Sequence, residues 1–237
     1  MEVGPPMAEF DRVARRYEKI HTANIAASGE DSYYFARAKL RLIHDYLAET
    51  GRPLDGLVFL DIGCGTGKIE MALAECFAGA TALALDPSLE SLQVAAARAG
   101  QGIRFICAGG EAVPLASDIA DVALFATVLH HMNEPQSEAS LKEARRVLKP
   151  GGLLFVFEHN PLNPLTRRAV STCEFDKDAT LLWPRQAKGL CRRAGWVSVR
   201  RRYTVFFPHF LRGLRFLERR LAWLPLGAQY VVIGTKG

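Results

Sequence analysis

The feature that most constrains this chain is a short apolar run that ends in an acid and three closely spaced glycines. The run covers residues 57–62 and contains Asp61, and glycines follow at positions 63, 65 and 67, where an amphipathic pattern begins. This order predicts a strand, a tight turn and a helix. Glycine permits positive φ and lets a ligand approach the main chain, and a helix N-terminus offers unpaired N–H groups. Such turns, at the carboxyl ends of strands, are where open α/β sheets bind nucleotides.

Apolar runs alternate with amphipathic segments along most of the chain. Strands that alternate with helices at this spacing predict a parallel sheet with helices on both faces, and nearly continuous apolar runs are typical of buried parallel strands. The predicted strands are 57–62, 81–85, 103–107, 121–127, 153–157, 196–207 and 229–235. The predicted helices are 8–20, 33–49 (capped by Ser32), 67–78, 88–99, 136–148, 165–173, 183–194 and 209–223. The fold class is therefore α/β, a Rossmann-like doubly wound sheet.

Length and composition fit one α/β domain in a reducing compartment. The 237 residues are 49% hydrophobic, which suits a single full core. We expect neither a signal peptide nor a membrane-spanning segment, since no basic flank precedes an apolar start and no run approaches ~20 apolar residues. The five cysteines show no C-x-x-C spacing, so they are interpreted as free thiols, with no metal site. These features predict a cytoplasmic protein.

Charge is distributed unevenly. Residues 1–158 carry 15 Lys and Arg against 21 Asp and Glu, a net charge of −6, whereas residues 159–237 carry 15 against 4, a net charge of +11. A basic surface of this kind fits an anionic small substrate, an anionic membrane surface or nucleic acid, and it also fits plain solubility.

The glycine spacing distinguishes this turn from two common nucleotide-binding motifs. A dinucleotide fingerprint, G-x-G-x-x-G, requires glycine where this chain has Lys68, and the Walker pattern is absent. Asp86 ends the second predicted strand, where an acid can accept hydrogen bonds from two ribose hydroxyls. The structural alternative for Asp86 or Ser88 is to cap the helix that follows, and both roles can hold at once.

Several motifs now occur in a recognisable order. They are Asp61–Gly67, Asp86-Pro87-Ser88, Glu111–Leu115, Asp121-Val122, Val128–His131 and Leu141–Gly152. Over about residues 55–158 this series resembles the class I S-adenosylmethionine-dependent methyltransferases. The resemblance implies a seven-stranded sheet with an antiparallel last strand. It divides the chain into an N-terminal helical cap (1–52), a cofactor-binding core (53–158) and a substrate-side half (159–237) with a basic insertion at 206–226.

The resemblance also assigns residues to S-adenosyl-L-methionine. Asp61 would orient the amino group, Asp86 would hold the ribose diol, and Pro87 would pack on the adenine. The family's usual Asp-Ala-Glu is replaced by Gly109-Gly110-Glu111, so the adenine contact falls to the backbone, Glu111 or water. The implied cofactor-binding residues are Asp61, Gly63, Cys64, Gly65, Gly67, Asp86, Pro87, Gly110, Glu111 and Thr127.

An oxygen nucleophile needs a base to remove its proton, and histidine titrates near neutral pH. The candidates at strand ends are His131 and His159, with Glu158 as a further option. His130 is interpreted as structural, and for His131 too the alternative is a structural role in packing the loop on the next helix.

Aromatic and basic residues from both ends of the chain are predicted to cover the binding site of the methyl acceptor. The substrate candidates are Tyr17, Tyr34, His209 and Arg212. Arginines among aromatics suit an acceptor with an anionic head and an apolar body. The segment 206–226 could instead lie on an anionic membrane surface, at the inner face, or simply pack its apolar side on the sheet.

Three functions compete. The first is O- or C-methylation of a small or lipid-linked, anionic, partly apolar acceptor. The second is an RNA-directed methyltransferase, ranked lower because the chain has no recognisable RNA-binding appendage. The third is a cofactor-binding regulatory protein without turnover, against which the intact Asp61, glycine and Asp86 positions argue.

Overall fold

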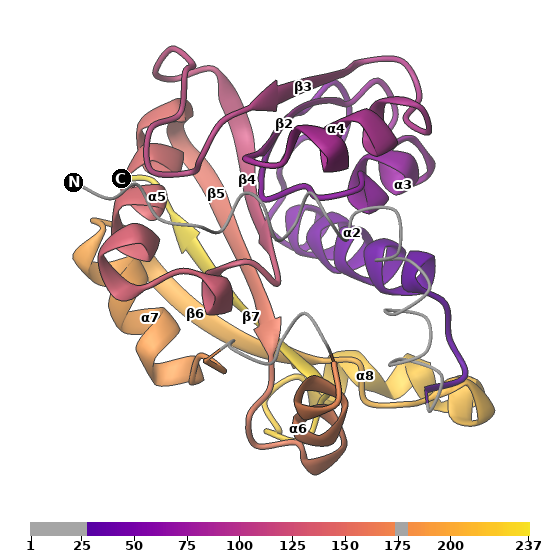
Figure 1. Ribbon diagram of the computed structural model, residues 1–237. Coiled ribbons are helices and arrows are strands. Elements are labelled where there is room, and N and C mark those ends of the chain that lie inside the picture. The colour runs from indigo at the N-terminus through magenta and orange to yellow at the C-terminus, as the bar shows by residue number, and fades with distance from the viewer. Residues whose placement is uncertain (1–27, 174–179) are drawn as a thin grey trace.

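Seven strands form one sheet in the order β3-β2-β1-β4-β5-β7-β6 (Figure 1). The computed structural model describes residues 28–173 and 180–237. Strand β7 is antiparallel to both β5 and β6, and the other neighbouring pairs are parallel. The strands are β1 (Val58–Ile62), β2 (Thr81–Asp86), β3 (Ile103–Cys107), β4 (Ala120–Ala126), β5 (Leu148–His159), β6 (Val197–Thr204) and β7 (Gln229–Thr235). The predicted seven-stranded sheet with an antiparallel last strand is confirmed.

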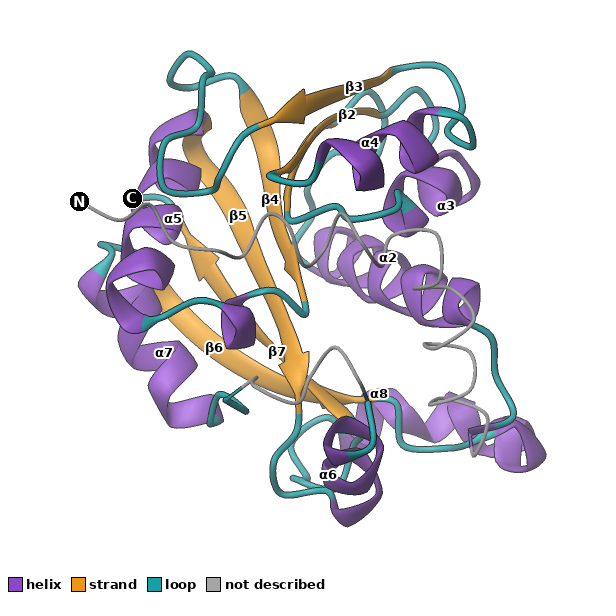
Figure 2. Ribbon diagram, in the orientation of Figure 1, coloured by secondary structure: helices purple, strands orange, loops and turns teal. Residues whose placement is uncertain are grey.

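Helices cover both faces of this sheet (Figure 2). They are α2 (Ser32–Glu49), α3 (Lys68–Cys76), α4 (Leu89–Ala96), α5 (Glu134–Val147), α6 (Pro164–Ser171), α7 (Pro184–Arg193) and the single turn α8 (Glu218–Leu221), with 3₁₀ segments η2 (Leu129–His131) and η4 (His209–Leu217). The predicted helix 8–20 and Tyr17 lie outside the described residues. The predicted cap of α2 is wrong by one position, because Asp31 Oδ1 accepts the Tyr34 N–H at 2.6 Å. Among the described residues, no helix is both long enough and apolar enough to cross a bilayer.

The core has two layers because successive side chains of a strand point to opposite faces. On β5, Leu154 and Val156 pack with α5 and α7, while Phe155 and Phe157 pack with α2 and α3. Figure 1 shows these two helix groups on either side of the sheet. On β1, Leu60 and Ile62 belong to the layer that packs on α5 and α7. Asp61 lies between them in the strand, so its side chain points to the α2–α3 side.

Two elements differ from the sequence prediction. Strand β5 begins at Leu148, paired with Ala120, so residues 149–152, between the predicted helix 136–148 and the predicted strand 153–157, lie inside the strand, at an irregularity in the β4–β5 register. The predicted helix 209–223 is η4 followed by α8, with a kink at Leu211, where φ is −105°. Local apolar spacing cannot separate a 3₁₀ segment from an α-helix when no tertiary contact selects between them.

The carboxyl ends of the parallel strands meet at one edge of the sheet. The loops after β1, β2, β4 and β5 therefore lie together. Asn133 begins α5 with a capping box, its Oδ1 accepting the Gln136 N–H at 2.9 Å, which fixes the start of the helix after η2. The helical segment η4–α8 lies between β6 and β7, as predicted, and Figure 1 places it with α6 beyond the end of β5.

Candidate active site at the carboxyl edge of the sheet

The turn after β1 is tied to the neighbouring strand by its own backbone. Gly63 and Cys64 both donate their N–H groups to the Leu85 carbonyl, at 2.7 and 2.9 Å. Gly63 has a φ of +80°, and a Cβ there would lie 2.6 Å from Val128 Cγ2. Glycine is therefore required both by the backbone and by the close approach of the loop after β4. Burial raises the pKa of the Cys64 thiol, so this side chain is inert packing.

Gly65 is the position of the turn that faces open space. Its φ is +52°, and no atom lies within 4 Å of where a Cβ would be. Gly67 differs, because a Cβ there would meet Ala95 of α4 at 2.8 Å. A ligand can therefore approach the main chain at Gly65, while Gly67 allows α3 and α4 to pack closely.

Asp86 fixes the turn and the start of α4 at the same time. Its Oδ2 accepts the Gly65 N–H at 2.8 Å, and its Oδ1 accepts the Ser88 N–H at 2.9 Å. Ser88 is the residue that caps α4, through its Oγ and the Ser91 N–H. Two main-chain N–H groups thus hold the Asp86 carboxylate at the end of β2, where the ribose-binding acid is predicted.

Two buried carboxyl groups lie beneath the glycine turn. Asp61 at the end of β1 is 1% exposed and Glu70 in the first turn of α3 is 3% exposed. Among the described residues, no other side chain donates a hydrogen bond to their four carboxyl oxygens, and the two acids interact with each other. Burial raises the pKa of Glu70 to about 7, and burial together with Glu70 and Asp86 raises the pKa of Asp61 well above its ordinary value. The charge of Lys39 acts in the opposite direction on Asp61 but does not outweigh these effects, and the two acids lack the hydrogen-bond donors that buried carboxylates require.

Sequence reasoning missed Glu70. An acid in the first turn of a helix is expected to complement the helix dipole from the surface. Glu70 instead follows Ile69 and precedes Ala72 and Leu73, all three of them buried. An acid inside an apolar helical stripe, directly after a glycine turn, was the available signal.

A buried lysine from α2 reaches the same region and was also missed. Lys39 is 7% exposed, and its Nζ lies 5.9 Å from the ring centroid of Phe157 at the end of β5. Burial, together with the charge of Lys68, lowers the pKa of Lys39 to about 8, while Glu158 and Asp61 act in the opposite direction. Its spacing from Ala36, Leu40 and Ile43, on the apolar stripe of α2, was the sequence signal.

On the other side of β5, Glu158 organises the loop after β4. Its Oε2 lies 2.6 Å from His130 Nδ1, and its Oε1 accepts the Leu129 N–H at 2.9 Å. Burial alone would raise the pKa of Glu158, but the charge and hydrogen bond of His130, the charge of His159 and the Leu129 N–H outweigh it, so the pKa lies below its ordinary value. Glu158 and His130 are both fully buried and form a structural pair.

The two histidines predicted as bases surround this pair. The His131 ring is centred 4.1 Å from that of His130, and the His159 ring 5.3 Å. His131 is exposed and His159 is half-buried, whereas His130 is 5% exposed. The structure therefore brings both candidates to the carboxyl edge, where each of their rings contacts the ring of His130.

The remaining predicted cofactor residues line the same edge. Thr127 follows β4 with a φ of +61°, a strained conformation for a branched residue, and its N–H donates to the Phe157 carbonyl at 2.8 Å. Gly110 is buried, and a Cβ there would lie 2.8 Å from both Ile62 Cγ2 and Ser140 Oγ. Pro87 follows β2, and Glu111 is exposed in the loop after β3. Close packing therefore requires glycine at position 110, whereas the exposed side chain of Glu111 is not confined in this way.

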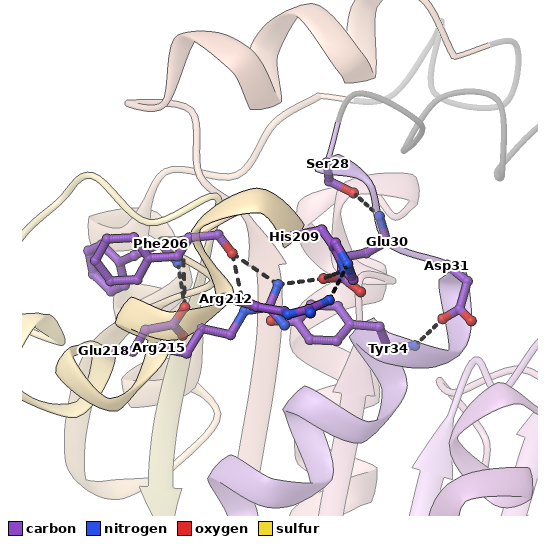
Figure 3. Close-up of polar contacts among 10 residues, drawn as sticks. Ser28, Glu30, Asp31, Tyr34, Phe206, His209, Arg212, Arg215 and Glu218 are labelled. Carbon is purple, nitrogen blue, oxygen red and sulfur yellow. Dashed lines mark hydrogen bonds and ion pairs between the residues drawn. The ribbon is translucent and has the colours of Figure 1, made fainter.

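The predicted substrate residues lie in a different cluster, where η4 meets the start of α2 (Figure 3). His209 Nδ1 lies 3.0 Å from Glu30 Oε1, and Arg212 lies 2.7 Å from His209 Nε2. The Tyr34 ring lies under the Arg215 guanidinium, at 4.3 Å. These three predicted residues therefore contact the joint between two elements.

Within the described part of the chain, no three His, Cys, Asp or Glu side chains are arranged to hold a metal ion.

Comparisons with known proteins find a family match for the middle of the chain. The sequence profile described as a methyltransferase domain matches residues 59–152. Residues 59–152 are therefore similar to a class I S-adenosylmethionine-dependent methyltransferase domain. S-adenosylmethionine is the cosubstrate of this family.

Two relatives and two solved structures illustrate the match. The chain is 38% identical to a ubiquinone biosynthesis O-methyltransferase of Parvibaculum lavamentivorans over 112 residues (46% of this chain, 43% of the relative). It is 33% identical to a ubiquinone/menaquinone biosynthesis C-methyltransferase of Syntrophotalea carbinolica over 160 residues (66% and 62%). The matches thus span less than two thirds of these relatives.

The fold is shared over nearly the whole chain. A SAM-dependent methyltransferase of Thermotoga maritima superposes with a TM-score of 0.66 at 23% identity, covering 98% of this chain and 99% of that one. A TehB-like SAM-dependent methyltransferase of Corynebacterium glutamicum gives 0.60 at 17%, covering 97% and 99%.

The site fits this cosubstrate on two observations. The donorless pair Asp61–Glu70 suits an ammonium group, and the open space at Gly65 suits close approach of a ligand to the main chain.

Proposed function

We propose that this protein transfers a methyl group from S-adenosylmethionine to an oxygen or carbon atom of a small, partly apolar acceptor, either free or lipid-linked. The observation that carries the proposal is the buried acid pair Asp61–Glu70 beside the open turn at Gly65. Two adjacent buried carboxyls without donors are costly, and a bound ammonium group removes that cost. When bound, the cosubstrate supplies a methyl group already activated by positive sulfur.

The chain's own residues divide the binding task by charge. Asp61 and Glu70 accept from the ammonium group, and Lys39 attracts the carboxylate at the same end of the ligand. Asp86 accepts from the ribose hydroxyls, and Pro87 covers the adenine, with Glu111 or the backbone near Gly110 on its polar edge. Holding the donor rigidly is the main catalytic requirement, since the methyl group must lie in line with the acceptor atom.

The acceptor side is assigned to the ends of β4 and β5. A ring nitrogen of His131 or His159 takes the proton from an acceptor hydroxyl, while Glu158 and His130 hold the loop that carries His131. A carbon nucleophile on an electron-rich ring would use the same base. The relatives' names, ubiquinone biosynthesis O-methyltransferase and ubiquinone/menaquinone biosynthesis C-methyltransferase, support an acceptor of phenolic character.

The test is a transfer assay with radiolabelled cosubstrate. The acceptors are a catechol and a hydroquinone that each carry a short isoprenoid chain, with single-stranded RNA as the comparison. We expect label in a phenol and none in RNA. His131→Gln or His159→Gln should lower kcat/KM by about 10²–10⁴-fold for an oxygen acceptor. The matched control is His44→Gln, a half-buried histidine of α2 whose ring lies near Phe77.

The outcomes separate the alternatives. Label in RNA would replace this function with an RNA-directed one. Calorimetric binding of S-adenosylhomocysteine without transfer to any acceptor would favour a regulatory protein. Full activity in both histidine variants would remove them as bases.

A further inference from the structure

The segment between β6 and β7 exposes the apolar side chains that a packing helix would bury. No residue of η4 or α8 is buried. Phe210 is 79% exposed, Phe216 72%, Trp223 72% and Leu226 59%. Phe206 packs against the core, but these four side chains are not packed on the sheet. Exposed apolar groups gathered on one short segment mark an interaction surface.

Polar contacts on the inner side hold this segment in place. Glu218 Oε1 accepts the N–H groups of Phe206 and Phe207, at 3.2 and 3.3 Å. Arg215 donates to the Phe207 carbonyl and to Glu30 (Figure 3). Arg219 pairs with Glu49 of α2. The segment is thus anchored by charges and hydrogen bonds, and its apolar side chains are left for another partner.

The start of α6 extends the same surface. Asn160 Nδ2 donates to the Gly227 carbonyl at 2.7 Å, and Asn163 Nδ2 to the Leu226 carbonyl at 2.8 Å. These bonds hold the α6 turn, with Leu162 46% exposed and Leu165 78% exposed, beside the end of the segment. Figure 1 shows α6 and α8 at the same end of the molecule. We call residues 160–168 and 206–226 together the apolar-basic surface.

The charges of this surface are almost all positive. It contains six arginines and one acid, Glu218, which is half-buried and turned to the backbone. Arg167, Arg168, Arg212 and Arg220 are exposed, and none pairs with an acid among the described residues. Aromatic and leucine side chains surrounded by arginines are typical of segments that lie in the interface of an anionic bilayer.

We propose that the apolar-basic surface docks on an anionic lipid bilayer, with Phe210, Phe216 and Trp223 inserted among the headgroups. The three aromatic side chains could stack with bases, but RNA is disfavoured because the exposed leucines Leu162, Leu165 and Leu226 give bases no stacking platform. The surface begins at Asn160, directly after His159 at the end of β5. Docking therefore turns the candidate active site toward the bilayer, and a lipid-linked acceptor would enter from there. The docking itself requires neither cosubstrate nor acceptor.

The experiment is flotation of the full chain with lipid vesicles, without cosubstrate. One set contains phosphatidylcholine alone, and the other contains about 30 mol% phosphatidylglycerol. We expect at least about ten-fold more protein bound to the anionic vesicles, and release as salt rises from about 0.1 M to about 0.5 M. Vesicles with brominated acyl chains should quench Trp223, and Trp223→Phe should remove that part of the quenching.

Two double variants test the two parts of the surface. Phe210→Ser with Phe216→Ser removes apolar area, and Arg212→Glu with Arg220→Glu reverses charge while leaving the anchors Arg215 and Arg219 intact. Each should lower binding about ten-fold or more without moving Tm. The matched controls are Leu89→Ser, on α4 at 57% exposure, and Arg104→Glu with Arg192→Glu. The controls should bind like the parent chain.

Several results would overturn the proposal. They are no flotation with anionic vesicles, equal flotation with neutral vesicles, or control variants that lose binding equally. Dimerisation that disappears in Phe210→Ser with Phe216→Ser, without vesicle binding, would assign the surface to a second copy. Binding of single-stranded RNA by this surface instead of vesicles would assign it to RNA. Each readout is independent of methyl transfer, so failure here leaves the proposed function standing.

Discussion

At the scale of single residues, the decisive groups are buried charges that no local pattern requires. Asp61, Glu70 and Lys39 lie under the glycine turn, and Glu158 lies with His130 on the other side of the sheet. Each is costly to bury, so each must be compensated by a partner or by a ligand.

Cosubstrate binding should depend on pH through Glu70. Its pKa is raised to about 7, chiefly by burial, and a bound ammonium group favours the ionised form. Binding should therefore release a proton below about pH 7, and affinity should fall as pH drops. Calorimetry of S-adenosylhomocysteine in buffers of different ionisation enthalpy measures the release. Glu70→Gln should remove the pH dependence, and an unchanged proton release in that variant would contradict the assignment.

Lys39 should lower the free energy of unfolding while strengthening cosubstrate binding. Because its pKa is lowered from 10.5 to about 8, the unfolded chain binds more protons between these values, and stability rises with pH across that range. Lys39→Met should raise the free energy of unfolding at pH 7 by about 1–3 kcal/mol and flatten that rise. It should also weaken S-adenosylhomocysteine binding about ten-fold or more. Urea titrations at pH 7 and pH 9.5 give the first pair of results, and calorimetry gives the third.

The contrasting control for Lys39 is Lys142→Met. Lys142 lies on the surface of α5, paired with Glu138. Its replacement should change stability by less than about 1 kcal/mol and leave binding unchanged. Equal effects in both variants would mean that Lys39 is an ordinary packed side chain.

Glu158 should be a structural group. Its pKa is lowered because His130, His159 and the Leu129 N–H together outweigh burial, so its stabilisation is present above its ordinary pKa and is lost as pH falls through the lower folded value. Glu158→Gln should cost about 3 kcal/mol of unfolding free energy, because it leaves His130 without its ionic partner. Urea unfolding monitored by far-ultraviolet circular dichroism measures the loss. A variant of unchanged stability would show that the pair contributes nothing to the fold.

At the scale of elements, the predicted substrate residues lie at the joint between α2 and the β6–β7 segment. Tyr34, His209 and Arg212 were grouped by their aromatic and basic character, but acids of α2 and the preceding loop hold this region together. Glu30 meets both His209 and Arg215, and Glu49 meets Arg202 and Arg219. Part of the basic charge read from the sequence is therefore neutralised within the fold.

Loss of Glu30 should loosen the segment without unfolding the protein. Burial raises its pKa, but Arg215 and His209 outweigh this and the pKa lies below the ordinary value, so the contact persists at neutral pH. Glu30→Ala should speed amide hydrogen exchange in residues 206–226 about ten-fold, while Tm falls only slightly. Asp55→Ala, an exposed acid beside β1, is the matched control. Unchanged exchange in Glu30→Ala would mean that the other anchors suffice.

At the scale of the whole molecule, the predicted and observed folds agree because sheet topology is encoded by a strong, repeated signal. Continuous apolar runs and amphipathic helices alternate across most of the chain, and a doubly wound sheet buries both. The prediction failed where local signals are equivocal, at the register irregularity before residue 153 and in the 3₁₀ segment 209–217.

The sequence by itself determined the fold and the family resemblance of the central residues, and it predicted the turn that we propose for the cosubstrate. Asp61, the glycines and Asp86 are close along the chain, so their motif can be recognised without knowledge of distant contacts. Only the tertiary structure decided which groups complete the site and which surface remains open. Lys39, Glu70 and Glu158 become notable only once burial is known, and burial depends on what the rest of the chain brings against a residue. The exposed apolar residues of 206–226 have a helical pattern that fits packing equally well. Their exposure follows from charged anchors between segments more than 150 residues apart, which no local pattern can reveal.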